Sequence, residues 1–189
     1  MGQLELICGS MFSGKSEELI RRTRRVVIAK KKIAVFKPSI DKRYGASTVN
    51  SHNGSSMEAR VVDIDDTEAI RTTALREQVD VVAIDEAQFF DDKLVGVVNA
   101  LVAGGLRVIV AGLDLDFAGR PFGPMPALLA LADEVTKLKA ICVKCGEPAF
   151  HTQRLINGQP ASARDPLIAI GGKESYEARC RKCYELRED

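Results

Sequence analysis

Residues 9 to 16 form the group of side chains most suited to chemistry in this sequence. They read, in order, Gly9, Ser10, Met11, Phe12, Ser13, Gly14, Lys15 and Ser16. This G-x-x-x-x-G-K-S pattern lies between an apolar run and a helix-forming segment, the context in which it binds phosphate. The glycines let backbone N–H groups turn toward phosphate oxygens, Lys15 reaches the β- and γ-phosphates, and the Ser16 hydroxyl can bind magnesium. The pattern predicts a nucleoside triphosphate site; an ordinary glycine-rich turn is the alternative.

Two adjacent carboxylates follow the β-branched run Val79–Ile84. In phosphate-loop proteins an acid at the tip of a second strand holds the magnesium ion, and Asp85 fits that position. Glu86, one residue later, would point in a different direction and could accept a proton from an attacking hydroxyl group or water. The alternative is that Glu86 caps a helix or is simply solvated.

Four of the five cysteines form two C-x-x-C pairs, Cys142 with Cys145 and Cys180 with Cys183. Two such turns can supply the four thiolates of a tetrahedral zinc site. Because all four positions of the metal would be filled by protein, we expect the zinc to be structural. Redox chemistry is the alternative for these pairs, and Cys8 is most simply a small core residue.

Alternating strands and helices must position these groups. The predicted elements are helices over Gly14–Lys30, Thr67–Arg76, Asp91–Ala103 and Pro126–Leu131, and strands over Ile33–Phe36, Arg60–Ile64, Val79–Ile84, Leu106–Leu113 and Glu134–Ile141, with residues 39–58 an exposed loop. This order predicts an α/β fold of the P-loop NTPase (RecA-like) type, with a parallel sheet covered by helices on both faces. A smaller zinc-binding unit would follow, giving domains at residues 1–140 and 141–189.

Composition narrows the functional class. The 189 residues are 46% hydrophobic and 28% charged, with a net charge of +1, as expected of a globular protein without a nucleic-acid-binding surface. No apolar run approaches the ~20 residues that a membrane span requires. The N-terminus enters a strand without a leader segment, which favours a cytoplasmic protein with reduced cysteines.

Four stretches together resemble one known family. They are G-S-M-F-S-G-K-S at residues 9–16, D-E-A-Q-F-F at 85–90, L-D-x-D-F-x-x-x-P-F at 113–122 and Y-E-A-R-C-R-x-C at 176–183. In this combination the chain resembles the cytosolic, zinc-containing, tetrameric (type II) thymidine kinases, and its bacterial members most. The resemblance implies transfer of the γ-phosphoryl group of ATP to the 5′-hydroxyl of thymidine, giving thymidine monophosphate for DNA synthesis.

The resemblance also implies roles for individual residues. Glu86 matches the general base, and Asp85 and Gln88 match neighbouring positions on the magnesium and phosphate side. The phosphates would also be placed by Asp41, Lys42 and Arg43. The thymine pocket would be lined by Met11, Leu113, Phe117 and Phe122. From the sequence alone, Phe117 and Phe122 would more often be core residues.

A closing loop, the lasso, is implied over Thr152–Tyr176. Its base-contacting run would be Leu167, Ile168, Ala169, Ile170 and Gly171, with Thr152 at its start and Tyr176 supporting the sugar or base. Zinc would hold both loop ends and so lower the entropy cost of ordering the lasso. Ala169 stands where several relatives carry a larger aliphatic residue. The family further implies a homotetramer and feedback inhibition by thymidine triphosphate.

Two other functions are compatible with parts of the sequence. A nucleic-acid-stimulated P-loop ATPase could carry a zinc ribbon and a D-E-A-Q tip, but helicases need two motor lobes and a basic surface. A regulatory nucleotide switch with a zinc interaction module would not need the aromatic pair or the long segment between the cysteine pairs.

Overall fold

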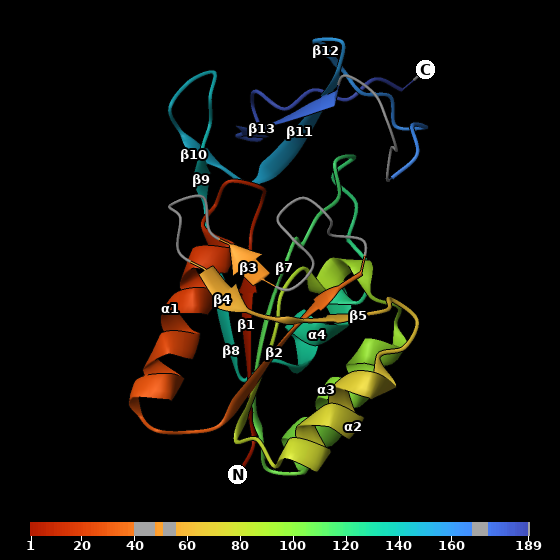
Figure 1. Cartoon of the computed structure of the whole chain (residues 1–189). Helices are drawn as coiled ribbons and strands as arrows, with labels where there is room; N and C mark the ends of the chain where they lie inside the picture. Colours follow the sequence, from red (N-terminus) through yellow and green to blue (C-terminus); the bar gives the residue numbers. More distant parts are fainter. Residues whose placement is uncertain (40–47, 51–55, 168–173, 189) are drawn as a thin grey trace.

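The structure is a computed structural model that describes residues 1–39, 48–50, 56–167 and 174–188. Its centre is a six-stranded sheet in the order β5-β2-β6-β7-β1-β8, with every neighbouring pair parallel (Figure 1). The strands are β1 (Gln3–Cys8), β2 (Ile33–Pro38), β5 (Arg60–Val62), β6 (Val81–Ile84), β7 (Arg107–Gly112) and β8 (Glu134–Lys137). The predicted parallel α/β fold is therefore confirmed.

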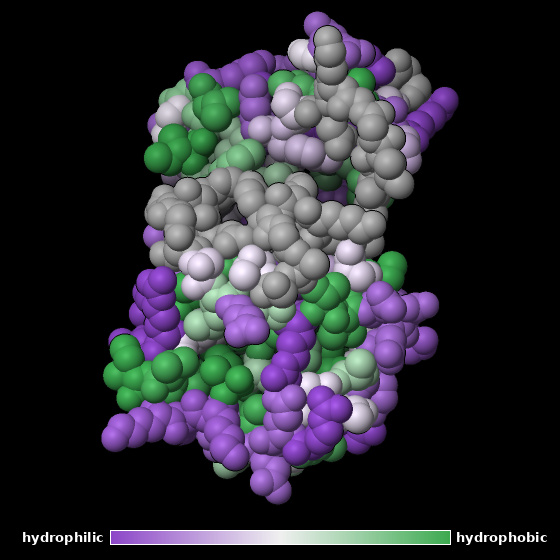
Figure 2. Space-filling view, viewed as in Figure 1, coloured by the Kyte–Doolittle hydropathy of each residue, from purple (hydrophilic) through white to green (hydrophobic). Residues whose placement is uncertain are grey.

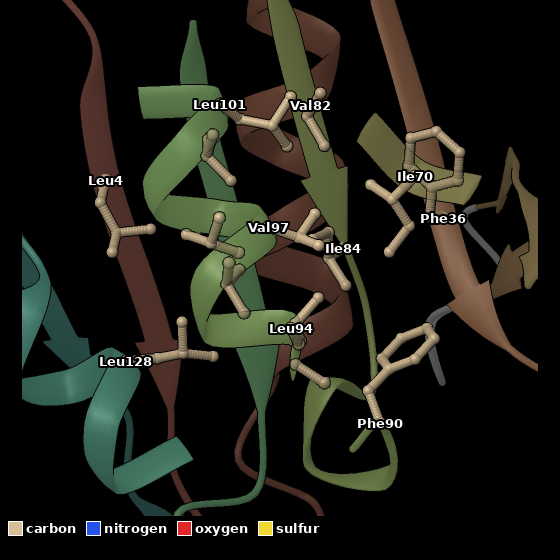
Figure 3. Close-up of a cluster of buried hydrophobic side chains, with 14 of the residues drawn as sticks. Leu4, Phe36, Ile70, Val82, Ile84, Phe90, Leu94, Val97, Leu101 and Leu128 are labelled. Atoms are coloured by element: carbon tan, nitrogen blue, oxygen red, sulfur yellow. The ribbon is translucent and has the colours of Figure 1, made fainter. Parts of the chain in front are cut away.

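Helices cover both faces of this sheet. One face is covered by α1 (Lys15–Ile28), whose buried Leu19, Ile20 and Val26 recur at helical spacing. The other face is covered by α2 (Glu68–Glu77), α3 (Lys93–Ala103) and α4 (Met125–Leu131). Figure 3 shows the hydrophobic core on this second face of the sheet, in which side chains of α3 lie against those of β6 and β1. The β-branched run of β6 is fully buried, as a central parallel strand requires.

Two sequence predictions of element type were wrong. Within residues 39–58, expected to be an unstructured loop, β3 (Thr48–Asn50) and β4 (Ser56–Glu58) form an antiparallel pair, and Val49 packs into the core beneath α1. The strand expected over Glu134–Ile141 is divided. Its first half is β8, whereas β9 (Ala140–Ile141) leaves the sheet to pair with β10 (Pro148–Ala149).

A C-terminal unit lies beyond the carboxyl edge of the sheet (Figure 1). Besides β9 and β10 it contains β11 (His151–Ile156), which pairs antiparallel with both β12 (Gln159–Pro160) and β13 (Glu174–Arg179). The two ends of the predicted lasso are thus paired strands, since Thr152 lies opposite Ala178 and Tyr176 lies opposite Arg154.

The surface in the same view carries hydrophilic side chains over much of the sheet domain, with smaller hydrophobic areas between them (Figure 2). None of the helices in the described part of the chain is long and apolar enough to cross a membrane.

Candidate active site and metal centre

The phosphate loop joins β1 to α1, which confirms its predicted strand–loop–helix context. Gly9 has φ 143° and Gly14 has φ 89°, conformations that side chains with a Cβ atom rarely adopt. A Cβ atom on Gly9 would also lie 2.5 Å from the carbonyl oxygen of Leu138. The loop therefore requires glycine at both ends for its shape, as the motif predicts.

Lys15 is held inside this loop. Its Nζ donates a hydrogen bond to the carbonyl oxygen of Ser10 at 2.8 Å, and the side chain is 9% exposed. Burial lowers the pKa of the Lys15 ammonium, and the nearby carboxylates of Glu86 and Asp85 oppose that shift. A buried ammonium group within this loop is a suitable partner for a polyphosphate.

The second strand tip brings Asp85 beside the phosphate loop. The Ser16 hydroxyl donates to Asp85 Oδ2 at 3.2 Å. Burial, and then the adjacent Glu86 carboxylate, raise the pKa of Asp85 to about 7. The Asp85 carboxylate and the Ser16 hydroxyl are hard oxygen donors, the type of ligand that magnesium prefers.

Glu86 occupies an unusual backbone position. It has φ 51° and ψ 40°, in the left-handed region, immediately before the short 3-10 helix η1 (Ala87–Phe89), and its side chain makes no capping hydrogen bond. Gln88 Nε2 donates to Glu86 Oε2, while Gln88 Oε1 accepts the N–H of Leu113 at 2.9 Å. Gln88 thus connects the Glu86 carboxylate to the backbone at the end of β7. Glu86 precedes η1 as its N-cap residue, but its side chain does not cap the helix, which was one of the alternatives left open by the sequence.

The four cysteines of the C-x-x-C pairs come together, as predicted. Their sulfur atoms all lie within 4.8 Å of one another, and all are free thiols; the four residues are Cys142, Cys145, Cys180 and Cys183. In a tetrahedral site with Zn–S distances of about 2.3 Å, neighbouring sulfurs are about 3.8 Å apart. One pair, Cys145 and Cys180, is 3.6 Å apart. The cluster therefore fits a structural zinc ion. The remaining cysteine, Cys8, is fully buried in the core, as predicted.

The residues expected near thymine lie at the junction between the sheet and the C-terminal unit. The N–H of Met11 donates to Thr152 Oγ1 at 3.0 Å, joining the phosphate loop to β11. Phe117 and Phe122 are both buried, at 6% and 8% exposed. Phe122 packs edge-to-face against Phe89 at 5.6 Å between ring centroids.

The other expected site residues lie partly within and partly outside the described residues. Leu167 is 44% exposed, and Tyr176 lies on β13. The positions outside the described residues are Asp41, Lys42, Arg43, Ile168, Ala169, Ile170 and Gly171.

Two residues near Phe117 were not anticipated from the sequence. The guanidinium of buried Arg154 lies 4.9 Å from the Phe117 ring centroid. The Tyr184 hydroxyl donates to the carbonyl oxygen of Phe117 at 2.7 Å. The only available sequence signal was the location of Tyr184 directly after the last zinc cysteine.

Comparison with known protein families agrees with this geometry. The family described as thymidine kinase matches residues 2–184, which includes the phosphate loop, the carboxylates after β6 and all four zinc cysteines. An ATP-dependent nucleoside kinase is therefore indicated by both the family and the arrangement of its phosphate loop. This chain belongs to the thymidine kinase family.

Proposed function

We propose that this enzyme transfers the γ-phosphoryl group of ATP to the 5′-hydroxyl of thymidine, with Glu86 as the general base. The observation that carries the proposal is the convergence of Lys15, Ser16 and Asp85 with Glu86 beside them. The phosphate loop and Lys15 bind the triphosphate. The 5′-oxygen attacks the γ-phosphorus, the bond to the β-phosphate oxygen breaks, and the hydroxyl proton moves to the Glu86 carboxylate.

The oxygen donors Ser16 and Asp85 would hold magnesium. The pair fits the ion because the Asp85 carboxylate is buried and its pKa is raised to about 7, so a divalent cation would offset the unfavourable burial of its charge. When bound, magnesium neutralises charge on the β- and γ-phosphate oxygens. The remaining site assignments rest on the resemblance, with Asp41, Lys42 and Arg43 near the phosphates and the lasso over the base.

One assay separates this function from its rivals. We expect purified protein with Mg·ATP to release ADP only when thymidine is added, and to form thymidine monophosphate in equal amount. Stimulation by single-stranded DNA instead would indicate a nucleic-acid-stimulated ATPase. Turnover that depends on neither addition would favour a nucleotide switch.

We also propose that the enzyme is a homotetramer and that thymidine triphosphate inhibits it. Both follow from the resemblance. In the inhibited complex the thymine would occupy the nucleoside pocket while the phosphates extend toward Lys15. Light scattering on the eluting protein tests the assembly. For the inhibitor, apparent competition against both thymidine and ATP is expected, and inhibition that ignores both substrates would contradict the shared-site model.

A further inference from the structure

Tyr184 connects the metal-binding cluster to the loop that follows β7. Its N–H donates to the carbonyl oxygen of Cys180 at 3.0 Å, so its backbone belongs to the second cysteine turn. Its hydroxyl donates to the carbonyl oxygen of Phe117 at 2.7 Å, across 67 residues of sequence. One residue therefore touches both the zinc turn and the segment that carries Phe117.

The Tyr184 ring is fixed in place by its surroundings. It stacks on His151 of β11 with ring centroids 4.5 Å apart and planes inclined by 21°. A Cβ atom on Gly119 would lie 3.7 Å from the Tyr184 hydroxyl, so the loop passes close to it. The contact with Phe117 is thus part of a packed interface.

The C-terminal unit also contacts the ring of Phe117. Arg154 of β11 lies over the Phe117 ring at 4.9 Å and donates from Nη1 to the carbonyl oxygen of Pro166 at 2.6 Å. Inside the loop, Asp116 Oδ1 accepts the N–H groups of Ala118 and Arg120 at 2.8 and 2.9 Å. The loop has a defined shape of its own, and its attachment to the C-terminal unit determines where Phe117 stands. Figure 1 shows the segment after β7 reaching toward β11 and β13.

We propose that Tyr184 is a positioning residue for nucleoside binding, acting by fixing the backbone of Phe117 relative to the zinc cluster. The inference rests on the proposed assignment of Phe117 to the thymine pocket. The hydroxyl contributes nothing to the sulfur ligands, because its hydrogen bond is to Phe117. Its contribution is to the order of the pocket wall, and ordering a binding surface before the ligand arrives increases affinity.

Tyr184→Phe tests this role because it removes the hydroxyl and keeps the ring that stacks on His151. We expect the thymidine Kd, measured by calorimetry without ATP, and the thymidine KM to rise by about 2- to 12-fold, the range for one hydrogen bond. The KM for ATP, the kcat at saturating thymidine and the zinc content should stay at wild-type values. Lys144→Met is the matched control, because Lys144 makes an exposed contact with Glu185 at 2.9 Å in the same unit. Wild-type thymidine affinity is expected for it.

A double-mutant cycle identifies the route of the effect. If Tyr184 acts through Phe117, adding Tyr184→Phe to Phe117→Leu should change the thymidine Kd less than twofold, because coupled residues are not additive. Three results would each overturn the inference while leaving the kinase function intact. They are wild-type thymidine affinity in Tyr184→Phe, an undiminished effect of Tyr184→Phe on the thymidine Kd in the Phe117→Leu background, and loss of zinc from Tyr184→Phe. Wild-type protein that binds no thymidine would overturn the proposed function itself.

Discussion

At the scale of single residues, the proposed chemistry depends on a carboxylate held in an uncommon conformation. Glu86 has φ 51° although it is not glycine, and such positions persist where the surrounding structure enforces them. Gln88 supplies part of that enforcement by joining the Glu86 carboxylate to the N–H of Leu113. The proposed general base is thus oriented by a neighbour two residues away and by the end of a different strand.

Glu86→Gln should retain nucleotide binding and lose at least ~10²-fold in kcat, since it keeps the shape of the side chain and removes the proton acceptor. Steady-state kinetics with saturating thymidine and direct measurement of ATP binding check both halves of this expectation. A kcat close to the wild-type value would remove Glu86 from the role of base.

Gln88→Leu should lower kcat by about tenfold with an unchanged KM for ATP, because it releases the Glu86 carboxylate and leaves the N–H of Leu113 without its acceptor. The resemblance assigns Gln88 to the phosphate side, and a role in phosphate binding predicts the opposite result for Gln88→Leu. A raised KM for ATP with a normal kcat would favour phosphate binding by Gln88 over orientation of Glu86.

Residues within short motifs could be predicted, whereas long-range contacts could not. The phosphate loop and the cysteine pairs encode their geometry in local spacing, and the structure forms both. The contacts of Tyr184 and Arg154 with Phe117 join distant parts of the chain. A lone tyrosine or arginine carries no spacing that indicates such a partner.

At the scale of elements, strongly patterned segments were predicted well and short ones were not. The β-branched run ending at Ile84 became a buried central strand. The pair β3–β4 has only three residues in each strand, too few for periodicity to be recognised, and is stabilised by its pairing and by Val49 in the core. The N–H of Leu138 still donates to the carbonyl oxygen of Cys8 at 2.8 Å, and the chain leaves the sheet after it, a point that no sequence pattern specifies.

Helix α1 is attached to the sheet by an ion-pair network centred on Arg22. Arg22 bonds Glu5 on β1 at 2.6 Å, Glu18 one turn earlier at 2.8 Å and the Thr136 hydroxyl on β8 at 2.8 Å. Hydrogen bonding to Arg21, and then to Arg22, lowers the pKa of Glu18 to about 2, against a desolvation effect that would raise it. Glu5 is shifted in the same direction, because its bonds to Arg107 and Arg22 together outweigh burial, and the pKa of its carboxyl is lowered.

The free energy of unfolding should therefore decrease as the pH falls from about 4.5 to about 2, because the folded state loses stabilising carboxylates that the unfolded state protonates earlier. Glu18→Gln should make this decrease less steep, as measured by denaturant titrations across that pH range. Asp65→Asn, which removes one exposed negative charge, is the control. An identical pH slope in Glu18→Gln and the wild-type protein would contradict the assigned pairing.

At the scale of the whole molecule, the hydrophobic cores fall into separate groups. The two large clusters lie on the two faces of the sheet. The third consists of Ala140, Ala149 and Ala178 with Cys142 and Cys180, and Cys183 packs against it. The metal ligands are thus a substantial part of the core of the C-terminal unit. This separation supports our proposal of two domains, but because Ala140 belongs to β9 and to the third core, it favours a boundary just before residue 140 over the proposed division into 1–140 and 141–189.

Removal of zinc should consequently weaken thymidine binding before it unfolds the sheet domain. The small third core has little apolar surface apart from its cysteines, and structural zinc contributes on the order of 10–16 kcal/mol of apparent binding energy in small fingers. Without the metal, β11 and β13 would lose the anchor that holds the lasso ends and the contacts with Phe117, whereas the cores against α1 and α3 contain no zinc ligand.

We expect a chelator to raise the thymidine Kd at least tenfold at a temperature where the sheet domain stays folded by circular dichroism and still binds ATP. Cys145→Ser should reproduce the effect, because its sulfur belongs to the cluster while the residue itself is exposed. Unchanged thymidine affinity after verified loss of zinc would show that the lasso is positioned independently of the metal. Concerted unfolding of both units would instead show that the sheet domain depends on the zinc unit for its stability.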